Sequence, residues 1–134
     1  MDTASVGRIG ERFARLGRED RPAFIPYVTV GYPSLEATRE LTVGLADVGA
    51  DVIELGIPFS DPMADGPTIQ RASQHALDGG TTTDDVFRVL VDLRSRSDVP
   101  VVLFTYLNAV VARGVESFVA EAVRAGADGL LTTD

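Results

Sequence analysis

A repeated segment constrains the fold of this chain more than any other feature of its sequence. Residues 44–56 read GLADVGADVIELG, and residues 121–134 read EAVRAGADGLLTTD. In each copy, a helix-like segment leads through Gly-Ala-Asp into an apolar run that is typical of a buried strand. We expect Gly49 and Gly126 to lie just past the helices, where glycine adopts a left-handed conformation at little cost. A turn that recurs in this way indicates repeated strand–helix units in a parallel sheet.

Apolar runs at intervals along the chain supply the strands of such a sheet. We predict strands within residues 23–31, 51–58, 99–108 and from 129 onward, because each run is rich in β-branched, aliphatic or aromatic residues. Strands of a parallel sheet are covered on both faces, which explains why these runs are almost continuously apolar.

Helical periodicity fills the intervals between the strands. The predicted helices cover residues 6–16, 34–48, 68–77, 81–94 and 115–125. In the second of these helices we expect Ser34 to be the N-cap, and Leu41, Leu45 and Val48 to form the buried face. The 134 residues are enough for one globular core, so we predict a single domain over 1–134.

Two α/β folds compete at this point. Four strand–helix units are half of an eight-stranded barrel, which needs roughly 200–250 residues. The alternative is an open flavodoxin-like sheet, which normally carries a phosphate-binding loop after its first strand. The corresponding segment here reads TVGYPS, and its single glycine and its proline make a poor anion cradle. The sequence therefore favours half of a barrel.

The residues that the chain lacks exclude several kinds of chemistry. It has no cysteine and no lysine, and His75 is its one histidine. Disulfides, thiolate nucleophiles and Schiff bases are therefore excluded, and no cluster has the spacing of zinc ligands. A net charge of −8 without a basic patch argues against a nucleic-acid partner. No apolar run reaches the roughly 18–20 residues that span a bilayer, so we expect a cytoplasmic protein and no membrane partner.

Two carboxylates in residues 54–70, ELGIPFSDPMADGPTIQ, are the strongest candidates for catalysis. Glu54 interrupts an aliphatic strand, and the alternation of side chains places Glu54 and Gly56 on one face, which we assign to the inside of the barrel. Glycine at position 56 would leave room for a ligand there. Asp65 follows in a loop shaped by prolines. A strand that carries one acid and a following loop that carries another are typical of an acid/base site in an α/β barrel.

Each of these residues also has a structural interpretation. Glu54 could form a salt bridge with an arginine, and Asp61 and Asp65 could be turn residues. Tyr27 and Tyr106 could line a pocket or belong to the core. No single residue decides between these interpretations.

The segment 54–70 resembles the signature of the α subunit of tryptophan synthase nearly from end to end. The resemblance continues at FIPYVTVGYP (24–33), GADVIELG (49–56) and LFTYLN (103–108). It implies an α/β fold, a TIM-type (β/α)8 barrel, here only the first four βα units plus an N-terminal helix, that is, a half-barrel. It also implies a lyase of tryptophan biosynthesis, which cleaves indole-3-glycerol phosphate by a retro-aldol reaction to indole and glyceraldehyde 3-phosphate.

The resemblance also implies roles for individual residues. Glu54 matches the catalytic glutamate of the family, and Asp65 matches its catalytic aspartate. Our hypothesis is that Glu54 is the general acid/base and that Asp65 accepts the indole N–H. Further positions match those that line the indole pocket of the family, namely Tyr27, Ile69, Phe104, Tyr106 and Leu131.

The resemblance further implies a partner. In the family, indole passes to a β subunit that holds pyridoxal phosphate, in an α2β2 heterotetramer, and the α subunit itself has no cofactor. The loop 58–66 would face that subunit, with Asp61 and Pro62 as contact residues.

Three interpretations of the chain as a whole stay open. It could be a partial sequence of an enzyme subunit, since the later strands that bind the substrate phosphate in the family are not among its residues. It could be an inactive half-barrel that self-associates. It could also be a non-catalytic module that binds the β subunit through residues 58–66.

Overall fold

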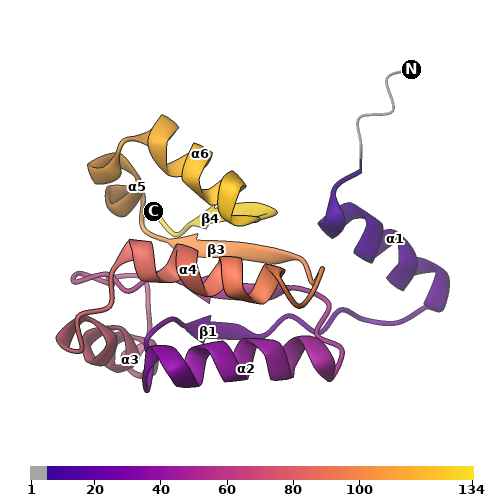
Figure 1. Ribbon diagram of the computed structural model, residues 1–134, viewed down its shortest axis with the longest axis horizontal. Helices are drawn as coiled ribbons and strands as arrows, with labels where there is room; N and C mark the ends of the chain where they lie inside the picture. Colours follow the sequence, from indigo (N-terminus) through magenta and orange to yellow (C-terminus); the bar gives the residue numbers. More distant parts are fainter. Residues whose placement is uncertain (1–5) are drawn as a thin grey trace.

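Four parallel strands in one sheet form the framework of the protein (Figure 1). The computed structural model describes residues 6–134. In chain order the elements are α1 (Arg8–Glu19), β1 (Tyr27–Thr29), α2 (Leu35–Asp47), β2 (Ile53–Gly56), α3 (Pro67–Asp78), α4 (Thr83–Arg94), β3 (Val101–Thr105), α5 (Leu107–Arg113), α6 (Val115–Ala125) and β4 (Gly129–Thr132). The strands lie in the sheet in the order in which they follow along the chain. This arrangement confirms the predicted succession of strand–helix units.

The strand register arranges the side chains of one sheet face in two rows. The first row contains Tyr27, Glu54, Val102 and Gly129, and the second contains Thr29, Gly56, Phe104 and Leu131. Because residues two apart along a strand point to the same side, both rows share one face. The alternate residues face the helices, and Leu55 and Leu103 are completely buried there. The predicted assignment of Glu54 to the face opposite the helices is therefore confirmed.

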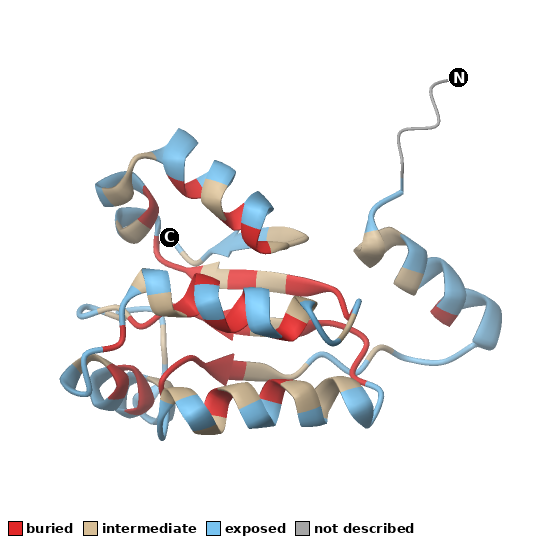
Figure 2. Cartoon of the chain, in the orientation of Figure 1, coloured by how far each residue is buried: buried red, intermediate tan, exposed pale blue. Residues whose placement is uncertain are grey.

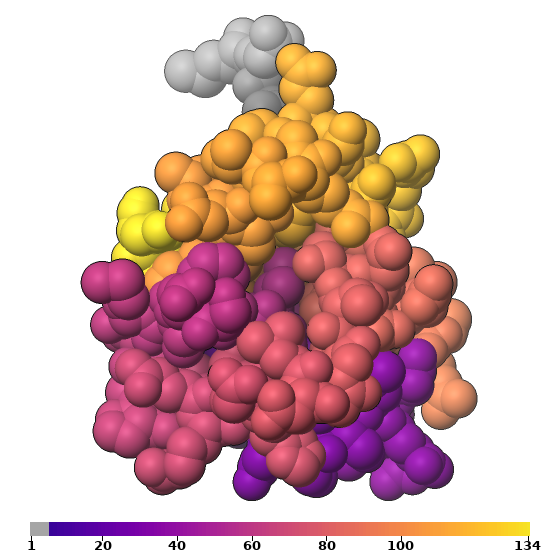
Figure 3. All heavy atoms as spheres, turned by 90° about the vertical axis from the view of Figure 1, so that its left-hand side faces the viewer, coloured from indigo at the N-terminus to yellow at the C-terminus, as the bar shows by residue number. Residues whose placement is uncertain are grey.

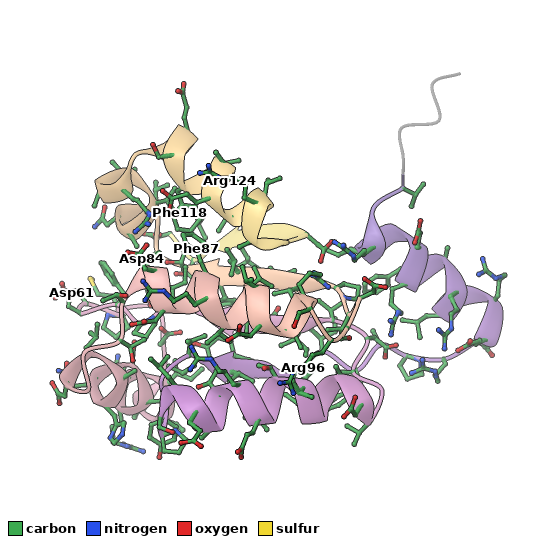
Figure 4. The ribbon with its side chains drawn as sticks, in the orientation of Figure 1. Asp61, Asp84, Phe87, Arg96, Phe118 and Arg124 are labelled. Carbon is green, nitrogen blue, oxygen red and sulfur yellow. The ribbon has the colours of Figure 1, made fainter. Side chains whose placement is uncertain are left out.

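The hydrophobic core lies between the sheet and helices α2, α4 and α6. Figure 2 shows that buried residues are concentrated in the sheet and on the helix sides that pack against it. Phe118 of α6 and Phe87 of α4 meet edge to face, with ring centroids 5.5 Å apart (Figure 4). Burial of each large apolar side chain contributes about 1.5–3 kcal/mol. These contacts pack the helices against the sheet face opposite Glu54.

Both copies of the Gly-Ala-Asp repeat make the same turn. Gly49 and Gly126 have φ angles of 97° and 101°, which confirms the left-handed conformation that we predict after each helix. The repeat aspartates, Asp51 and Asp128, each accept a hydrogen bond from a backbone N–H near the start of a neighbouring strand, at 2.8 and 2.9 Å. The two repeat aspartates therefore link β2 to the segment that leads into β1, and β4 to β3.

The same two aspartates attach α1 to the sheet. Nη1 of Arg12 lies 3.3 Å from Oδ1 of Asp51, and Nη1 of Arg8 lies 3.0 Å from Oδ1 of Asp128. Helix α1 consequently lies at the end of the sheet where the strands begin (Figure 1). It runs from Arg8 to Glu19, so the predicted end of this helix at residue 16 is wrong. The left-handed residue that ends the helix is Asp20, with a φ angle of 49°.

The third predicted strand is too long. Strand β3 ends at Thr105, and Tyr106 begins the separate helix α5 as its N-cap. The sequence does not reveal this helix, because its seven residues are too few to establish a helical period. A distant side chain supports its start, since the Leu107 N–H donates to Oδ1 of Asp134 at 2.7 Å.

The predicted buried face of α2 is wrong at Leu41 and Val48 and confirmed at Leu45. The side chains of Leu41 and Val48 are 47% and 77% exposed, whereas those of Thr38 and Thr42 are buried. The helical period locates an apolar stripe at Leu41, Leu45 and Val48, but it does not say which stripe the sheet covers. Here Thr38 and Thr42 pack inward, and Leu45 also contacts the hydrophobic core, whereas Leu41 and Val48 are exposed.

No helix within the described residues is both long and apolar enough to cross a membrane.

Candidate active site

The two candidate acids come from adjacent parts of the chain. Glu54 lies in β2, and Asp65 lies in the loop between β2 and α3, near the end of the sheet toward which the strands run. Both side chains are half-buried. This is the end at which α/β barrels carry their catalytic groups.

The hydroxyl of Tyr27 lies within electrostatic reach of both acids. Burial raises the pKa of Tyr27, and the negative charges of Asp65 and Glu54 raise that pKa further. A hydrogen bond opposes these effects, because Oγ1 of Thr29 donates to the Tyr27 hydroxyl at 3.3 Å. Tyr27 and Glu54 are thus neighbours in register on one sheet face, and the charge of Asp65 in the following loop also acts on Tyr27.

Glycine at position 56 makes room for an aromatic ring and not for a ligand, so that sequence interpretation is wrong. A Cβ atom at Gly56 would lie 2.0 Å from the hydroxyl oxygen of Tyr27, because the Tyr27 ring lies over the glycine. The Tyr27 ring also meets the ring of Phe104 edge to face, at 81° with centroids 5.4 Å apart. Phe104 is in register with Leu131 of β4. These side chains form an apolar wall beside the acids.

Tyr106 contacts Asp65 directly. Its hydroxyl donates to Oδ2 of Asp65 at 3.1 Å and accepts a hydrogen bond from the N–H of Ala64 at 2.9 Å. The ring is 5% exposed and stacks on Phe59, with centroids 4.9 Å apart and planes 17° apart. Burial is the largest cause that raises the pKa of Tyr106. Tyr106 therefore belongs both to the core and to the site.

Helix α3 holds the same loop from its other side. Oγ of Ser73 accepts a hydrogen bond from the Phe59 N–H at 3.0 Å. Nε2 of Gln70 donates to the carbonyl oxygens of Pro62 and Asp65, at 3.3 and 2.9 Å. Neither Ser73 nor Gln70 is a site residue predicted from the sequence, although Gln70 lies inside the 54–70 segment. Their roles depend on backbone atoms of the loop, which a pattern of residue types does not reveal.

The opposite side of the loop is open to solvent. Asp61 is exposed, and its carboxylate accepts a hydrogen bond from Oγ of Ser60 at 2.9 Å. Pro62 is half-buried, and Met63 is 90% exposed. Figure 4 shows Asp61 at the edge of the molecule beyond the ends of the strands. In Figure 3, which views this end, the loop lies against the segment that contains α5, as the Tyr106–Ala64 hydrogen bond requires.

Glu54 has no arginine partner among residues 6–134. None of the ion pairs between the described residues includes it. The structural interpretation of Glu54 as half of a salt bridge is therefore wrong for this part of the chain. A half-buried carboxylate without a cation beside it is suited to exchange protons with a bound molecule.

Two remaining predictions concern a pocket residue and metals. Ile69 lies in the first turn of α3 and is half-buried, and its place in a pocket stays a prediction. Within residues 6–134, no group of three or more potential metal ligands comes together. The site that the structure assembles thus contains Glu54 and Asp65 beside two tyrosine hydroxyls and an apolar wall.

Comparison with known proteins places this arrangement in context. Residues 13–134 match the family described as tryptophan synthase alpha chain. The tryptophan synthase alpha chain of Geotalea daltonii is 46% identical over 129 residues, which are 96% of this chain and 49% of the relative. That of Synechococcus elongatus is 49% identical over 126 residues, which are 94% of this chain and 47% of the relative. The chain thus spans about half the length of the curated relatives that it matches.

Solved structures agree with this match. The structure of tryptophan synthase subunit alpha from Legionella pneumophila str. Paris superposes with a TM-score of 0.94 at 42% identity, over 97% of this chain and 50% of that one. A chain of tryptophan synthase from M. tuberculosis, in its aminoacrylate-bound form, superposes with a TM-score of 0.90 at 38% identity, over 96% and 52%. The four strand–helix units correspond to half of these barrels.

Proposed function

Because the chain belongs to the tryptophan synthase alpha chain family, we propose that it supplies the catalytic acids of that enzyme's α subunit. The reaction is the cleavage of indole-3-glycerol phosphate to indole and glyceraldehyde 3-phosphate. The observation that carries the proposal is the position of the two acids: Glu54 lies beside Tyr27 on one sheet face, and the carboxylate of Asp65 is bound by the Tyr106 hydroxyl at 3.1 Å. We expect the substrate phosphate to bind outside residues 6–134, and we expect this chain to need no cofactor.

The proposed mechanism is a retro-aldol cleavage with two acids in different roles. Glu54 delivers a proton to C3 of the indole ring, and the positive charge that results is spread onto the ring nitrogen. Asp65, as a carboxylate, accepts the ring N–H and stabilises that charge. Glu54 then takes the proton of the adjacent glycerol hydroxyl, the carbon–carbon bond breaks, and its electron pair restores the aromatic ring. One proton enters and one leaves, so Glu54 returns to its starting state.

The apolar wall fits the flat substrate ring. Phe104 and Leu131 are neighbours in register on the same sheet face, and Tyr27 packs edge-on against Phe104. Aromatic rings stack on such surfaces with a gain of about 0.5–1.5 kcal/mol beyond the burial of area. In this proposal, Tyr27, Phe104 and Leu131 hold the indole ring between the two acids, and Ile69 and Tyr106 complete the pocket.

The assignment of Glu54 is tested by Glu54→Gln, assayed for indole release from indole-3-glycerol phosphate. The complete natural polypeptide that contains this chain is the appropriate protein. We expect the rate to fall by about 100-fold or more, because the amide neither gives nor takes a proton. The matched control is Glu40→Gln on the exposed side of α2, which should keep the wild-type rate. Indole release by Glu54→Gln at the wild-type rate would falsify the assignment.

We propose that the partner is a β subunit that carries pyridoxal phosphate, in an α2β2 assembly. The open side of the 58–66 loop, with Asp61 and Pro62, would contact that subunit. The loop is anchored to Tyr106 and Gln70 on its inner side, so a contact on its outer side acts close to Asp65.

The contact is tested by Asp61→Ala, with indole release measured at increasing concentrations of β subunit. We expect a weaker stimulation, and a half-maximal β concentration that is about threefold to tenfold higher, because a charged contact at an interface contributes about 1 kcal/mol. Asp47→Ala, which removes an exposed aspartate of α2, is the control. Equal stimulation of Asp61→Ala and the control would exclude this role for Asp61.

One observation favours a second candidate function, a half-barrel that pairs with a copy of itself. Strands β1 and β4 each have one unpaired edge, and apolar residues are exposed on the helices beside these edges. Val48, which directly follows α2, is 77% exposed, and Val123 of α6 is 66% exposed. Sedimentation of the 134-residue chain at several concentrations tests this candidate: dimers that form as the concentration rises support it, and a monomer throughout rules it out.

A further inference from the structure

We propose that Tyr106 is the positioning residue for Asp65, and that it acts through its hydroxyl as well as lining the pocket. This inference rests on the proposed function, because it concerns how one of its two acids is held. It arises from the two hydrogen bonds that the hydroxyl makes to consecutive residues of the loop.

The two hydrogen bonds constrain Asp65 in different ways. Oη of Tyr106 accepts from the Ala64 N–H at 2.9 Å, which holds the main chain just before the acid. The same hydroxyl donates to Oδ2 of Asp65 at 3.1 Å, which holds the carboxylate itself. One oxygen atom therefore fixes both the backbone and the side chain, and Oδ1 is left to accept a hydrogen bond from a substrate N–H.

Tyr106 is itself held by the rigid part of the molecule. It directly follows β3 and is the N-cap of α5, and its ring is 5% exposed. The ring stacks on Phe59, whose N–H is bound to buried Ser73 of α3. The position of the hydroxyl is thus set by the sheet and by α3, and the loop takes its shape from them.

The hydroxyl is a permanent donor at neutral pH. Burial raises the pKa of Tyr106 from its ordinary value, so the phenol keeps its proton over the range in which a carboxylate is ionised. A phenylalanine in its place keeps the stack on Phe59 but makes neither hydrogen bond. Tyr106→Phe therefore removes the positioning role of the hydroxyl and leaves the packing role of the ring.

Placement matters because Asp65 stands on an otherwise exposed loop. Ala64 and Gly66 on either side of it are exposed, and Gln70 holds only its carbonyl oxygen. A displacement of a catalytic group by about 1 Å costs about 100-fold in rate. Release of the carboxylate should therefore slow the chemical step more than it weakens the binding of substrate.

The test compares Tyr106→Phe with Tyr32→Phe, in the complete natural polypeptide with a β subunit present. Tyr32 is the one tyrosine of the chain besides Tyr27 and Tyr106, is 47% exposed and packs against His75. The loss of its hydroxyl should therefore leave kcat and KM unchanged. For Tyr106→Phe we expect kcat to fall roughly 10- to 100-fold, with KM changed by less than about threefold. Hydrogen exchange of the Ala64 amide, measured by NMR, should become about tenfold faster or more.

Three outcomes overturn the inference. The first is an unchanged kcat in Tyr106→Phe. The second is a rise in KM with kcat preserved, which would make Tyr106 only a wall of the pocket. The third is an Ala64 amide that exchanges no faster than in the wild type. Unchanged exchange of the β3 amides shows that the variant is folded. If the wild type releases no indole, the proposed function fails, and the Ala64 exchange alone then decides whether Tyr106 anchors the loop.

Discussion

At the scale of single residues, the partners of a carboxylate decide what it does in this protein. Asp51 is completely buried, yet it accepts hydrogen bonds from the Phe24 N–H and from the guanidinium groups of Arg21 and Arg12. Glu54, three residues later in the chain, has no such cation among the described residues. Asp51 is thus a structural acid and Glu54 a candidate catalytic one, although both lie in the same apolar run.

The pH dependence of the unfolding free energy tests the structural role of Asp51. The Arg21 guanidinium, with the Phe24 N–H and Arg12, lowers the pKa of Asp51 from 3.8 to about 2. A lowered folded-state pKa stabilises the protein above the unfolded value, and that contribution is lost as the pH falls from about 4 to 2. Urea unfolding at several pH values should therefore show a smaller acid loss of stability in Asp51→Asn than in the wild type.

At neutral pH the same variant should be less stable by about 2 kcal/mol, because two arginines and a backbone N–H lose a charged acceptor. Asp47→Asn, an exposed aspartate on α2, should retain the wild-type stability at neutral pH and the wild-type acid loss. A pH dependence of Asp51→Asn that matches the wild type would contradict the role of this carboxylate.

At the scale of elements, the ends and faces of helices depend on contacts far away in the chain. The α4 helix begins where local chemistry predicts, with Thr82 and Asp85 forming a reciprocal capping box. Helix α5, in contrast, begins against the side chain of Asp134, which lies 27 residues further along the chain. The buried threonine face of α2 likewise follows from packing on the sheet and α4. Periodicity identifies helices, but the surface that receives them selects their buried face.

The second prediction concerns the attachment of α1. We expect the double variant Arg8→Gln, Arg12→Gln to release this helix from the sheet, because the two arginines bind Asp128 and Asp51. Hydrogen exchange should become faster throughout α1, with little change in β2 and β3. The control is Arg15→Gln, whose partner Glu19 lies in α1 itself. Equal exchange in the double variant and the control would show that apolar contacts alone hold α1.

At the scale of the whole molecule, the four-stranded sheet is open at both edges. Helix α4 lies between α2 and α6. Its inner side is buried, as the fully buried Val89 and Leu90 of this helix show. Helices α2 and α6 flank it, and apolar side chains are exposed on α6 at Val123 and directly after α2 at Val48. The relatives of known structure extend to about twice the length of this chain, which agrees with two faces that remain uncovered in residues 6–134.

The third prediction concerns these faces. In the 134-residue chain, Val123→Ser should reduce concentration-dependent self-association, because it removes exposed apolar area next to the β4 edge. Val91→Ser changes an equally apolar residue, 51% exposed on the outer side of α4, and should not alter it. Analytical ultracentrifugation of both variants over a range of concentrations provides the measurement. Self-association that is equal in both variants would show that the α6 face is not the one that pairs.

The main residues of the candidate site can be predicted from the sequence, but the residues that hold them in position cannot. The alternation around Glu54 correctly predicts the sheet face on which it lies, because strand geometry is local. The role of Gly56 as a seat for the Tyr27 ring does not follow, since Tyr27 lies on the preceding strand. The positions of Ser73 and Gln70 likewise depend on backbone atoms of a folded loop.

The sequence by itself determined the succession of strand–helix units, the left-handed turns at Gly49 and Gly126, the sheet face of Glu54 and the family of the chain. All of these depend on side-chain types and spacings within a few residues. Only the tertiary structure decided how the aspartates are used, because their partners are distant in the chain. Asp51 binds a backbone N–H 27 residues away, Tyr106 reaches Asp65 across 41 residues, and Arg8 reaches Asp128 across 120. Such contacts form only when the sheet assembles, so the local pattern of residue types does not predict them.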